Sequence, residues 1–368
     1  MTSAMVRCGV DAEVLSLVAP RPEWLDAWPA TVHGLGATMG SYGYTNSLVP
    51  WLQMNHGNYT SILIHGVWRY PSVGVWRALR GKLTPYFLFT HGMLDPWFQK
   101  AYPLKHIKKT LFWKFGESQV LRDARAVLFT SEDEKRLARQ SFRPFECREL
   151  VIGLGTAPPP QYADAQLTEF LDRFPTLRDK RLILFLGRIH RKKGCDLLLR
   201  AFGASAEIDP RLHLVMAGPD DENWTGDLRR IALECRIADR ITWTGHLDGE
   251  QKWGAFRAAE VFALPSHSEN YGIAIAESLG CGVPVLITDK VNIWREILED
   301  GGGLAACDDL AGFTALLRRW CSMSQDEQQT FRDNALKSFR SRFELDGFAR
   351  RFVDFLESET TLAAPVRA

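Results

Sequence analysis

Short apolar runs alternate with longer amphipathic stretches along the whole chain. The run Leu182–Leu186 contains no polar residue, which is typical of a parallel strand that is buried on both faces of its sheet. Strand-like runs that alternate with helical patterns predict a doubly wound α/β fold. The expected strands are 12–18, 61–65, 85–90, 126–130, 182–186, 212–217, 240–244, 260–264 and 284–288.

The length of the chain, 368 residues, is more than one hydrophobic core comfortably supports. Within 153–165, three consecutive prolines interrupt the alternation of strands and helices, and we interpret this segment as an interdomain linker. We therefore expect an N-terminal domain over 1–157 and a C-terminal domain over 158–343, with a cleft between them. The last segment, 344–368, has the pattern of an amphipathic helix that could cross back to the first domain.

Composition excludes several classes of protein. The net charge of +1 gives no global field that would attract nucleic acid, so no nucleic-acid partner is expected. The seven cysteines are scattered without a C-x-x-C pair, which favours reduced thiols in the cytoplasm over disulfides or a zinc site. No apolar run approaches the roughly 20 residues that a membrane span requires.

Two glutamates lie eight positions apart near the most apolar part of the sequence. Glu269 follows the expected strand 260–264, at the end where α/β sheets bind ligands. Gly272 starts a helical run whose free N–H groups favour a phosphate. Glu277 lies in that helix, where its side chain leans back toward the helix start and could hold vicinal hydroxyls such as those of a ribose. The alternative is that both carboxylates are simply solvated.

A basic loop follows the strand 182–186. Arg188 offers a planar fork for phosphate oxygens, and Lys193 offers a compact point charge. An isolated charge run of this kind is usually a solvated surface. Here it occupies a strand-to-helix loop, where a ligand would bind.

Four ordered stretches carry a family resemblance: "GRIHRKKG" (187–194), "AGPD" (217–220), 241–272, and "AIAESLGCGVPVLITD" (274–289). Together they resemble the retaining family-4 glycosyltransferases, whose GT-B fold has two facing Rossmann-like domains. Glu269 and Glu277 match the E-x7-E motif of that family. The resemblance implies a metal-independent enzyme that moves a hexosyl unit from a nucleotide-diphosphate sugar to a glycan or lipid-linked acceptor, in polysaccharide or glycolipid synthesis.

The same resemblance implies roles for individual residues. Arg188 and Lys193 would hold the donor diphosphate, and Glu277 the ribose. Glu269 would face the reacting end of the donor sugar. The remaining implied donor contacts are the backbone N–H groups of Gly272 and Ile273, and Leu247, whose loop would lie near the base. No D-x-D motif occurs in the chain, so no metal and no cofactor beyond the nucleotide sugar is expected.

The N-terminal half offers two histidines and a basic segment. His91 follows the expected strand 85–90, where the family often has a histidine near the donor sugar and the acceptor; a core or surface histidine is the alternative. His65 is a second acceptor-side candidate. The segment 98–115 mixes lysines with aromatic residues. It could lie on an anionic membrane, which would make the protein peripheral at the cytoplasmic face, or it could be a helix with an apolar core face and solvated lysines.

The start of the chain departs from the family pattern. Residues 10–18 match the family's second strand rather than its first, so the first strand and its glycine-rich loop are expected to be absent, or the gap to be filled by unusual pairing. The physiological chain is then expected to begin upstream of Met1. Two other functions stay open at this point, a nucleotide-sugar epimerase on the same fold and a non-catalytic nucleotide-sugar binding protein.

Overall fold

The computed structural model describes residues 1–17, 28–36 and 38–361, apart from the side chains of Lys100 and Thr361. The chain divides into two compact units. Unit 1 contains residues 1–155 and 345–368, and unit 2 contains residues 156–344. The sequence pattern had placed these boundaries at 157/158 and 343/344. All seven cysteines are unpaired, and no helix within the described residues is long and apolar enough to cross a membrane.

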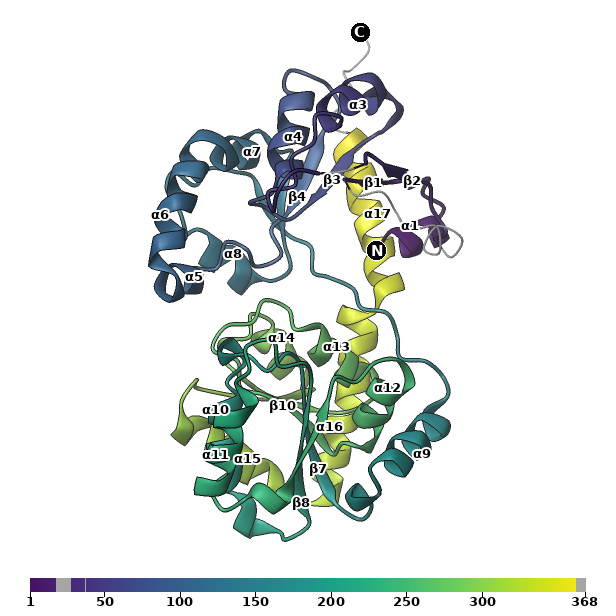
Figure 1. The fold of residues 1–368 in the computed structure, drawn as a ribbon. Coiled ribbons are helices and arrows are strands. Elements are labelled where there is room, and N and C mark those ends of the chain that lie inside the picture. The colour runs from purple at the N-terminus through teal and green to yellow at the C-terminus, as the bar shows by residue number, and fades with distance from the viewer. Residues whose placement is uncertain (18–27, 37, 362–368) are drawn as a thin grey trace. The chain divides into compact units, whose positions relative to one another are not determined.

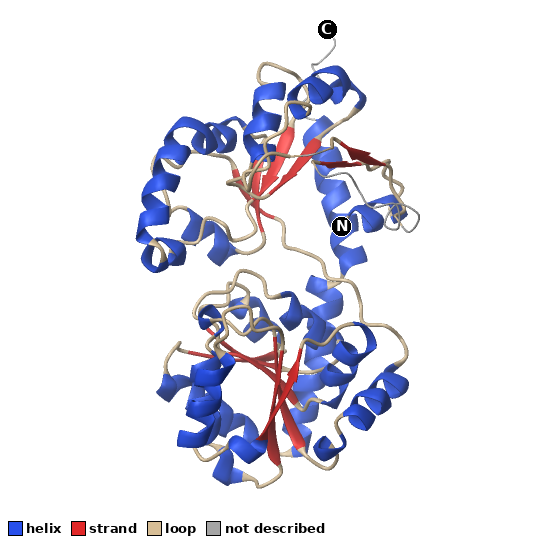
Figure 2. Ribbon diagram, in the orientation of Figure 1, coloured by secondary structure: helices blue, strands red, loops and turns tan. Residues whose placement is uncertain are grey.

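Unit 2 is built on a six-stranded parallel sheet with the order β12-β11-β10-β7-β8-β9. Figure 2 shows helices covering both faces of this sheet. Every residue of β8, β10 and β11 is buried, as expected for strands covered on both sides. The strands are β7 (Arg181–Leu186), β8 (Leu212–Ala217), β9 (Ile241–Gly245), β10 (Val261–Leu264), β11 (Val285–Thr288) and β12 (Gly303–Ala306).

The helices of unit 2 alternate with its strands along the chain (Figure 1). They are α9 (Ala163–Arg173), α10 (Cys195–Gly203), α11 (Thr225–Glu234), α12 (Gly249–Ala258), α13 (Ile273–Gly280), α14 (Trp294–Asp300), α15 (Leu310–Cys321) and α16 (Gln325–Ser338). Short 3₁₀ turns occur at Pro175–Leu177, Arg191–Lys193, Ala206–Ile208 and Ala238–Arg240, and a π-helical turn at Phe339–Phe343.

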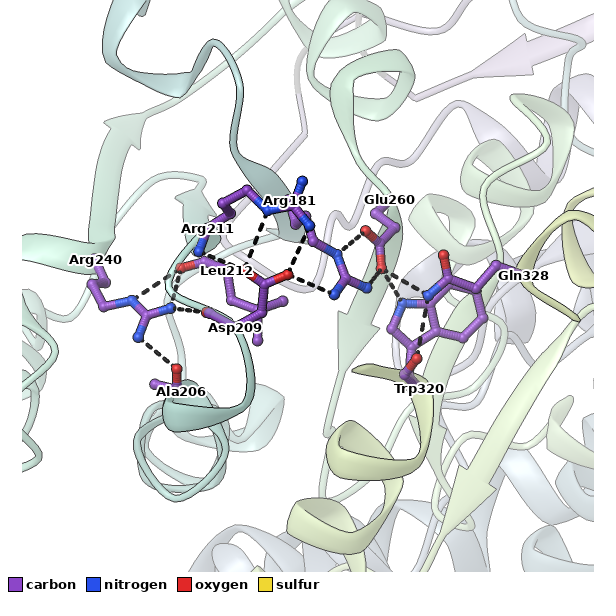
Figure 3. Close-up of polar contacts among 9 residues, drawn as sticks. All are labelled: Arg181, Ala206, Asp209, Arg211, Leu212, Arg240, Glu260, Trp320 and Gln328. Carbon is purple, nitrogen blue, oxygen red and sulfur yellow. Dashed lines mark hydrogen bonds and ion pairs between the residues drawn. The ribbon is translucent and has the colours of Figure 1, made fainter. Parts of the chain in front are cut away.

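An ion-pair network joins the amino ends of the central strands of unit 2 (Figure 3). Arg181, at the start of β7, donates two hydrogen bonds to the carboxylate of Glu260, at 2.8 and 2.7 Å. The same carboxylate accepts from Trp320 Nε1 at 2.9 Å, and Asp209 also pairs with Arg181. This network lies at the opposite end of the strands from the loops that follow them, so it supports the sheet without occupying its ligand-binding edge.

Unit 1 has a four-stranded parallel sheet with the order β3-β4-β5-β6 and a separate parallel pair, β1-β2. The strands are β1 (Val14–Ser16), β2 (Val32–Gly34), β3 (Ile62–His65), β4 (Tyr86–Phe89), β5 (Ala126–Phe129) and β6 (Glu149–Val151). The helices are α1 (Thr2–Arg7), α3 (Leu48–Asn55), α4 (Tyr70–Leu79), α5 (Trp97–Ala101), α6 (Pro103–Phe112), α7 (Ser118–Asp123), α8 (Glu132–Ala138) and α17 (Leu345–Thr361), with a 3₁₀ turn at His56–Asn58 and a π-helical turn at Trp113–Glu117.

Alternate residues of β4 pack into two separate cores. Tyr86 and Leu88 face a core that includes residues of α3, α4 and α7, whereas Phe87 and Phe89 face a core that includes residues of α1 and α17. The helix α17 is therefore part of unit 1. Near its end, the buried carboxylate of Glu359 accepts hydrogen bonds from Arg148 and Arg125, and these guanidinium groups lower its pKa.

The strand expected over 10–18 does not lie at the centre of a sheet. It is β1, which pairs in parallel with β2 so that Val14 faces Val32; residue 18 lies outside the described residues. Among these residues the four-stranded sheet ends at β3. Three short strands, β2, β6 and β12, were not expected from the sequence. None of them contains a long apolar run, so only their pairing with neighbours identifies them.

Candidate functional site

The middle of the unit 2 sheet brings two sequence-distant loops together. β7 and β10 are adjacent and parallel, with Val261 opposite Ile183. From this pair the strand order runs outward in opposite directions. The loops after β7 and β10 therefore leave the same edge of the sheet at its topological switch point, where open α/β sheets bind ligands.

A close backbone approach joins these two loops. Gly194 has φ of +65°, and a Cβ atom there would lie 2.0 Å from the carbonyl oxygen of Pro265. Next to it, the N–H of His267 donates to the carbonyl oxygen of Lys192 at 2.8 Å. Only glycine allows this conformation and this distance together. Gly194 therefore sets the distance between the basic loop after β7 and the loop after β10, which contains Glu269.

The loop after β7 presents cations at this edge. Arg188 is exposed, and its guanidinium has no hydrogen-bond or ion-pair partner among the described residues. Lys193 forms an ion pair with Glu269. Arg191 instead lies over the ring of Trp224, 4.8 Å from its centroid. Of these three cations, Arg188 is the one left open to an anionic ligand.

The loop after β10 leads into α13, and the first backbone N–H groups of this helix have no hydrogen-bond acceptor among the described residues. Gly272 has φ of +69° and precedes α13, which has no side-chain cap and no acidic residue in its first turn. The N–H groups of Gly272, Ile273 and Ala274 have no acceptor within the part of the chain that the structure describes. These free donors and the helix dipole make a positive end beside the basic loop.

Both predicted glutamates are held by lysines from other elements. Glu269, paired with Lys193, is also fixed by its backbone, because its N–H donates to Lys290 and its carbonyl oxygen accepts from Asn292. Glu277 Oε1 accepts from Lys252 Nζ at 2.8 Å. The helix α12 supplies Lys252, a residue that sequence reasoning missed. No spacing rule points to it, because a contact between two helices depends on how they pack.

The side chain of Leu247, implied to lie near the base, is buried, whereas that of the preceding His246 is exposed. A contact of Leu247 with a ligand would therefore have to use its backbone.

The two histidines of unit 1 lie side by side at the carboxyl ends of β3 and β4. His65 Nδ1 and His91 Nε2 are 2.9 Å apart, and the rings stack with centroids 5.2 Å apart. Desolvation lowers the pKa of His65 to about 4, with repulsion from His91 second, and desolvation also lowers the pKa of His91. Both rings are therefore neutral at pH 7, and one donates a hydrogen bond to the other.

A buried carboxylate that sequence reasoning missed orders the loop after β4. Glu134, on α8, accepts from the N–H of Gly92 and from Thr90 Oγ1, both at 2.6 Å. Its other oxygen accepts from the N–H and hydroxyl of Thr130. These bonds hold the residues on both sides of His91, whose φ is +49°. Among the described residues, no group of three His, Cys, Asp or Glu could hold a metal ion.

The comparisons with known proteins agree with this arrangement. The model of "Glycosyl transferases group 1" matches residues 168–338, and that of "Glycosyl transferase 4-like domain" matches residues 1–155. Both models describe glycosyl transferases and together they match most of the 368 residues, so the chain belongs to the glycosyl transferases. These matches confirm the family that the motifs of unit 2 predicted.

Curated relatives match part of this glycosyltransferase chain. A D-inositol 3-phosphate glycosyltransferase of Thermomonospora curvata is 37% identical over 151 residues, which cover 39% of this chain and 35% of the relative. One from Mycolicibacterium smegmatis is 31% identical, over 46% of this chain and 39% of the relative. The matches thus span less than half the length of either relative.

Solved structures match nearly the whole chain. HepE of Anabaena in complex with UDP has a TM-score of 0.75 at 15% identity and covers 97% of this chain and 95% of its own. Sucrose-phosphate synthase of Thermosynechococcus elongatus has a TM-score of 0.72 at 17% identity, with 98% and 92% covered. These likenesses confirm the predicted α/β GT-B fold.

The variant Gly194→Ala should lose stability, because a Cβ atom would collide with Pro265 and the left-handed backbone disfavours alanine. We expect the free energy of unfolding, measured by chemical denaturation, to fall by about 1–3 kcal/mol from backbone strain, and further from the collision. Gly226→Ala is the control, since a Cβ atom at this position in α11 meets nothing within 4 Å. Equal stability of Gly194→Ala and the parent would show that the loops do not depend on this contact.

Proposed function

We propose that the protein is a retaining glycosyltransferase that moves a hexosyl unit from a nucleotide-diphosphate sugar to a glycan or lipid-linked acceptor. The observation that carries this proposal is the convergence of Arg188, Lys193 and the free N–H groups at the start of α13 at one edge of the unit 2 sheet. Three sources of positive potential at a switch point suit a diphosphate. Structural support comes from HepE of Anabaena, which was solved in complex with UDP-glucose.

The main catalytic requirement of this reaction is to stabilise the negative charge that builds up on the leaving diphosphate. Arg188 and the helix start can stabilise that charge where it develops, without reorganising. An incoming diphosphate would compete with Glu269 for Lys193, and this exchange would free the Glu269 carboxylate for the hydroxyls of the donor sugar. In this proposal the cationic groups and the helix terminus replace a metal ion.

The two glutamates take different roles in the proposed reaction. Glu277, held by Lys252, would accept hydrogen bonds from the ribose hydroxyls. Glu269 would orient the donor sugar during front-face attack by the acceptor hydroxyl, and is not assigned as a nucleophile of the kind that retaining hydrolases use. His91, as a neutral imidazole that can donate or accept, is the unit 1 candidate for contacting a sugar hydroxyl.

Turnover should require both a nucleotide sugar and an acceptor. We expect released nucleoside diphosphate only when a glycan acceptor is added, and the rate should persist in EDTA because side chains supply the positive charge. A coupled assay with a panel of nucleotide sugars and acceptors measures both. Acceptor-independent conversion of the donor would indicate an epimerase, and donor binding without turnover a binding protein. Activity lost in EDTA and restored by magnesium or manganese would contradict the metal-free proposal.

The variants Arg188→Ala and Lys193→Ala should each weaken UDP binding by about 1.5–3 kcal/mol, as expected for charge-assisted hydrogen bonds. Isothermal titration calorimetry measures the affinity. Arg230→Ala is the matched control, because this arginine is exposed on α11 and pairs only with Asp227 among the described residues. Unchanged affinity in both site variants would remove the diphosphate assignment.

The finer part of the proposal is peripheral contact with an anionic membrane through 98–115. No residue of α6 is buried, although Trp113, just after this helix, packs in the core of unit 1. Leu104, Ile107 and Leu111, spaced along one side of the helix, are 82%, 62% and 59% exposed. The exposed Lys108 and Lys114 flank this apolar stripe. Apolar side chains with flanking lysines suit the interface of an anionic bilayer.

The variant Ile107→Glu should bind anionic vesicles less tightly, by about 1.5–3 kcal/mol of partition free energy, because one large side chain no longer enters the acyl boundary. Vesicle co-sedimentation measures the effect. Leu233→Glu, at a leucine that is 67% exposed on α11 of unit 2, is the control. Equal partitioning of both variants and the parent would show that α6 is not the membrane contact.

A further inference from the structure

The loop after β10, residues 265–272, lies among the loops of three neighbouring strands. β10 is flanked by β7 and β11, and β12 lies beyond β11. All four strands are parallel, so the loops that follow them leave the sheet at one edge. His267 lies in the loop after β10, two residues before Glu269, and it contacts loops on both sides of its own.

His267 joins the loop after β7 to the loop after β12. Its backbone N–H donates to the carbonyl oxygen of Lys192 at 2.8 Å, and its ring Nδ1 lies 2.6 Å from Asp308 Oδ1. The next residue, Asp309, caps α15 by accepting from the N–H of Gly312 at 2.7 Å. The carboxylate that holds the imidazole therefore belongs to an ordered loop, and His267 connects loops whose strands are not neighbours in the sheet.

The pair of His267 with Asp308 is partly shielded from water. The two side chains are 35% and 17% exposed. Asp308 raises the pKa of His267 by accepting its hydrogen bond and by its charge, and Asp196 in the first turn of α10 raises it further, although burial acts in the opposite direction. An imidazolium also makes a stronger hydrogen bond to a carboxylate than a neutral ring does. The folded loop therefore favours the protonated ring.

The cations on the neighbouring elements have contacts of their own. Lys192 meets His267 through its backbone carbonyl oxygen, so this contact does not depend on the ammonium group. The charges that dominate at the imidazole are the two carboxylates named above. The other contacts of nearby cations are those of Lys193 with Glu269, Lys290 with Asp289, and Arg191 with the ring of Trp224.

We propose that His267 is a positioning residue of the proposed donor site, and that its protonated form holds the loop of Glu269 against the basic loop after β7. While the ring is charged, its bond to Asp308 fixes this loop on one side and its backbone N–H fixes Lys192 on the other. Loss of the proton weakens the bond to Asp308, so the loop that presents Glu269 is held less firmly. The charge also adds to the positive potential that an incoming diphosphate meets. This inference rests on the proposed transfer reaction.

The pH dependence follows from the direction of the pKa shift. A histidine whose pKa is raised on folding contributes stability that is fully present below its ordinary pKa of about 6.5. This contribution is lost as the pH rises through the higher pKa of the folded protein. Affinity for a nucleoside diphosphate should therefore fall as the pH rises above about 6.5, in addition to any change caused by ionisation of the nucleotide.

Isothermal titration calorimetry with UDP across this pH range tests the role of His267. Comparison of each variant with the parent at the same pH cancels the ionisation of UDP. We expect His267→Gln to bind UDP about fivefold more weakly than the parent at about pH 5.5, and nearly equally at about pH 8.5. Asp308→Asn should lower the pKa of His267, which NMR of its ring protons measures, and should move the loss of UDP affinity to lower pH.

The matched control is His33→Gln. His33 of unit 1 pairs with Glu13 at 2.8 Å, and these two side chains are 32% and 28% exposed, so this variant removes a similar pair and should leave UDP affinity unchanged at every pH. A loss in His267→Gln that does not depend on pH, or an unshifted NMR titration of His267 in Asp308→Asn, would overturn the proposal. UDP binding with the same pH profile in the parent and both site variants would reject this role alone, whereas a parent that binds no UDP at any pH would reject the donor site and this role with it.

Discussion

The contact between Gly194 and the carbonyl of Pro265 is the constraint on which the candidate site at the carboxyl edge of the unit 2 sheet depends. It exists because β7 and β10 are neighbours in the sheet although about 80 residues separate them in the sequence. Parallel pairing sends both following loops to one edge, and the missing side chain lets them touch. The cations of one loop then lie beside the uncapped helix start of the other, which is what an anionic ligand requires.

At the carboxyl edge of the unit 2 sheet, some charged groups are paired with an opposite charge and others have no partner within the part of the chain that the structure describes. Lys193 and Lys252 neutralise the two glutamates of the motif, so the carboxylates tolerate partial burial. Arg188 and the backbone N–H groups at the start of α13 have no such partner among the described residues. The protein thus keeps both acids ordered and leaves hydrogen-bond donors open, as the proposed contacts with a diphosphate require.

Unit 1 shows how one helix can present different chemistry on its two sides. In an ordinary amphipathic helix the apolar side packs into the core, whereas on α6 the apolar stripe of Leu104, Ile107 and Leu111 is exposed and the other side carries Lys105 and Lys109. The inner side packs instead against the rings of Trp68 and Phe142. This inversion is the physical basis for the membrane contact proposed above.

The sequence by itself determined the fold class, the family and most of the strands, because continuous apolar runs such as Leu182–Leu186 and the spacing of Glu269 from Glu277 are local properties. Only the tertiary structure decided the rest. The residues of β12, Gly303–Ala306, form a strand because they pair with β11, and Lys252 reaches Glu277 because two helices pack. The sequence also did not decide which side of α6 faces solvent. Periodicity shows that a helix has an apolar face, but not whether that face packs against the core or is exposed.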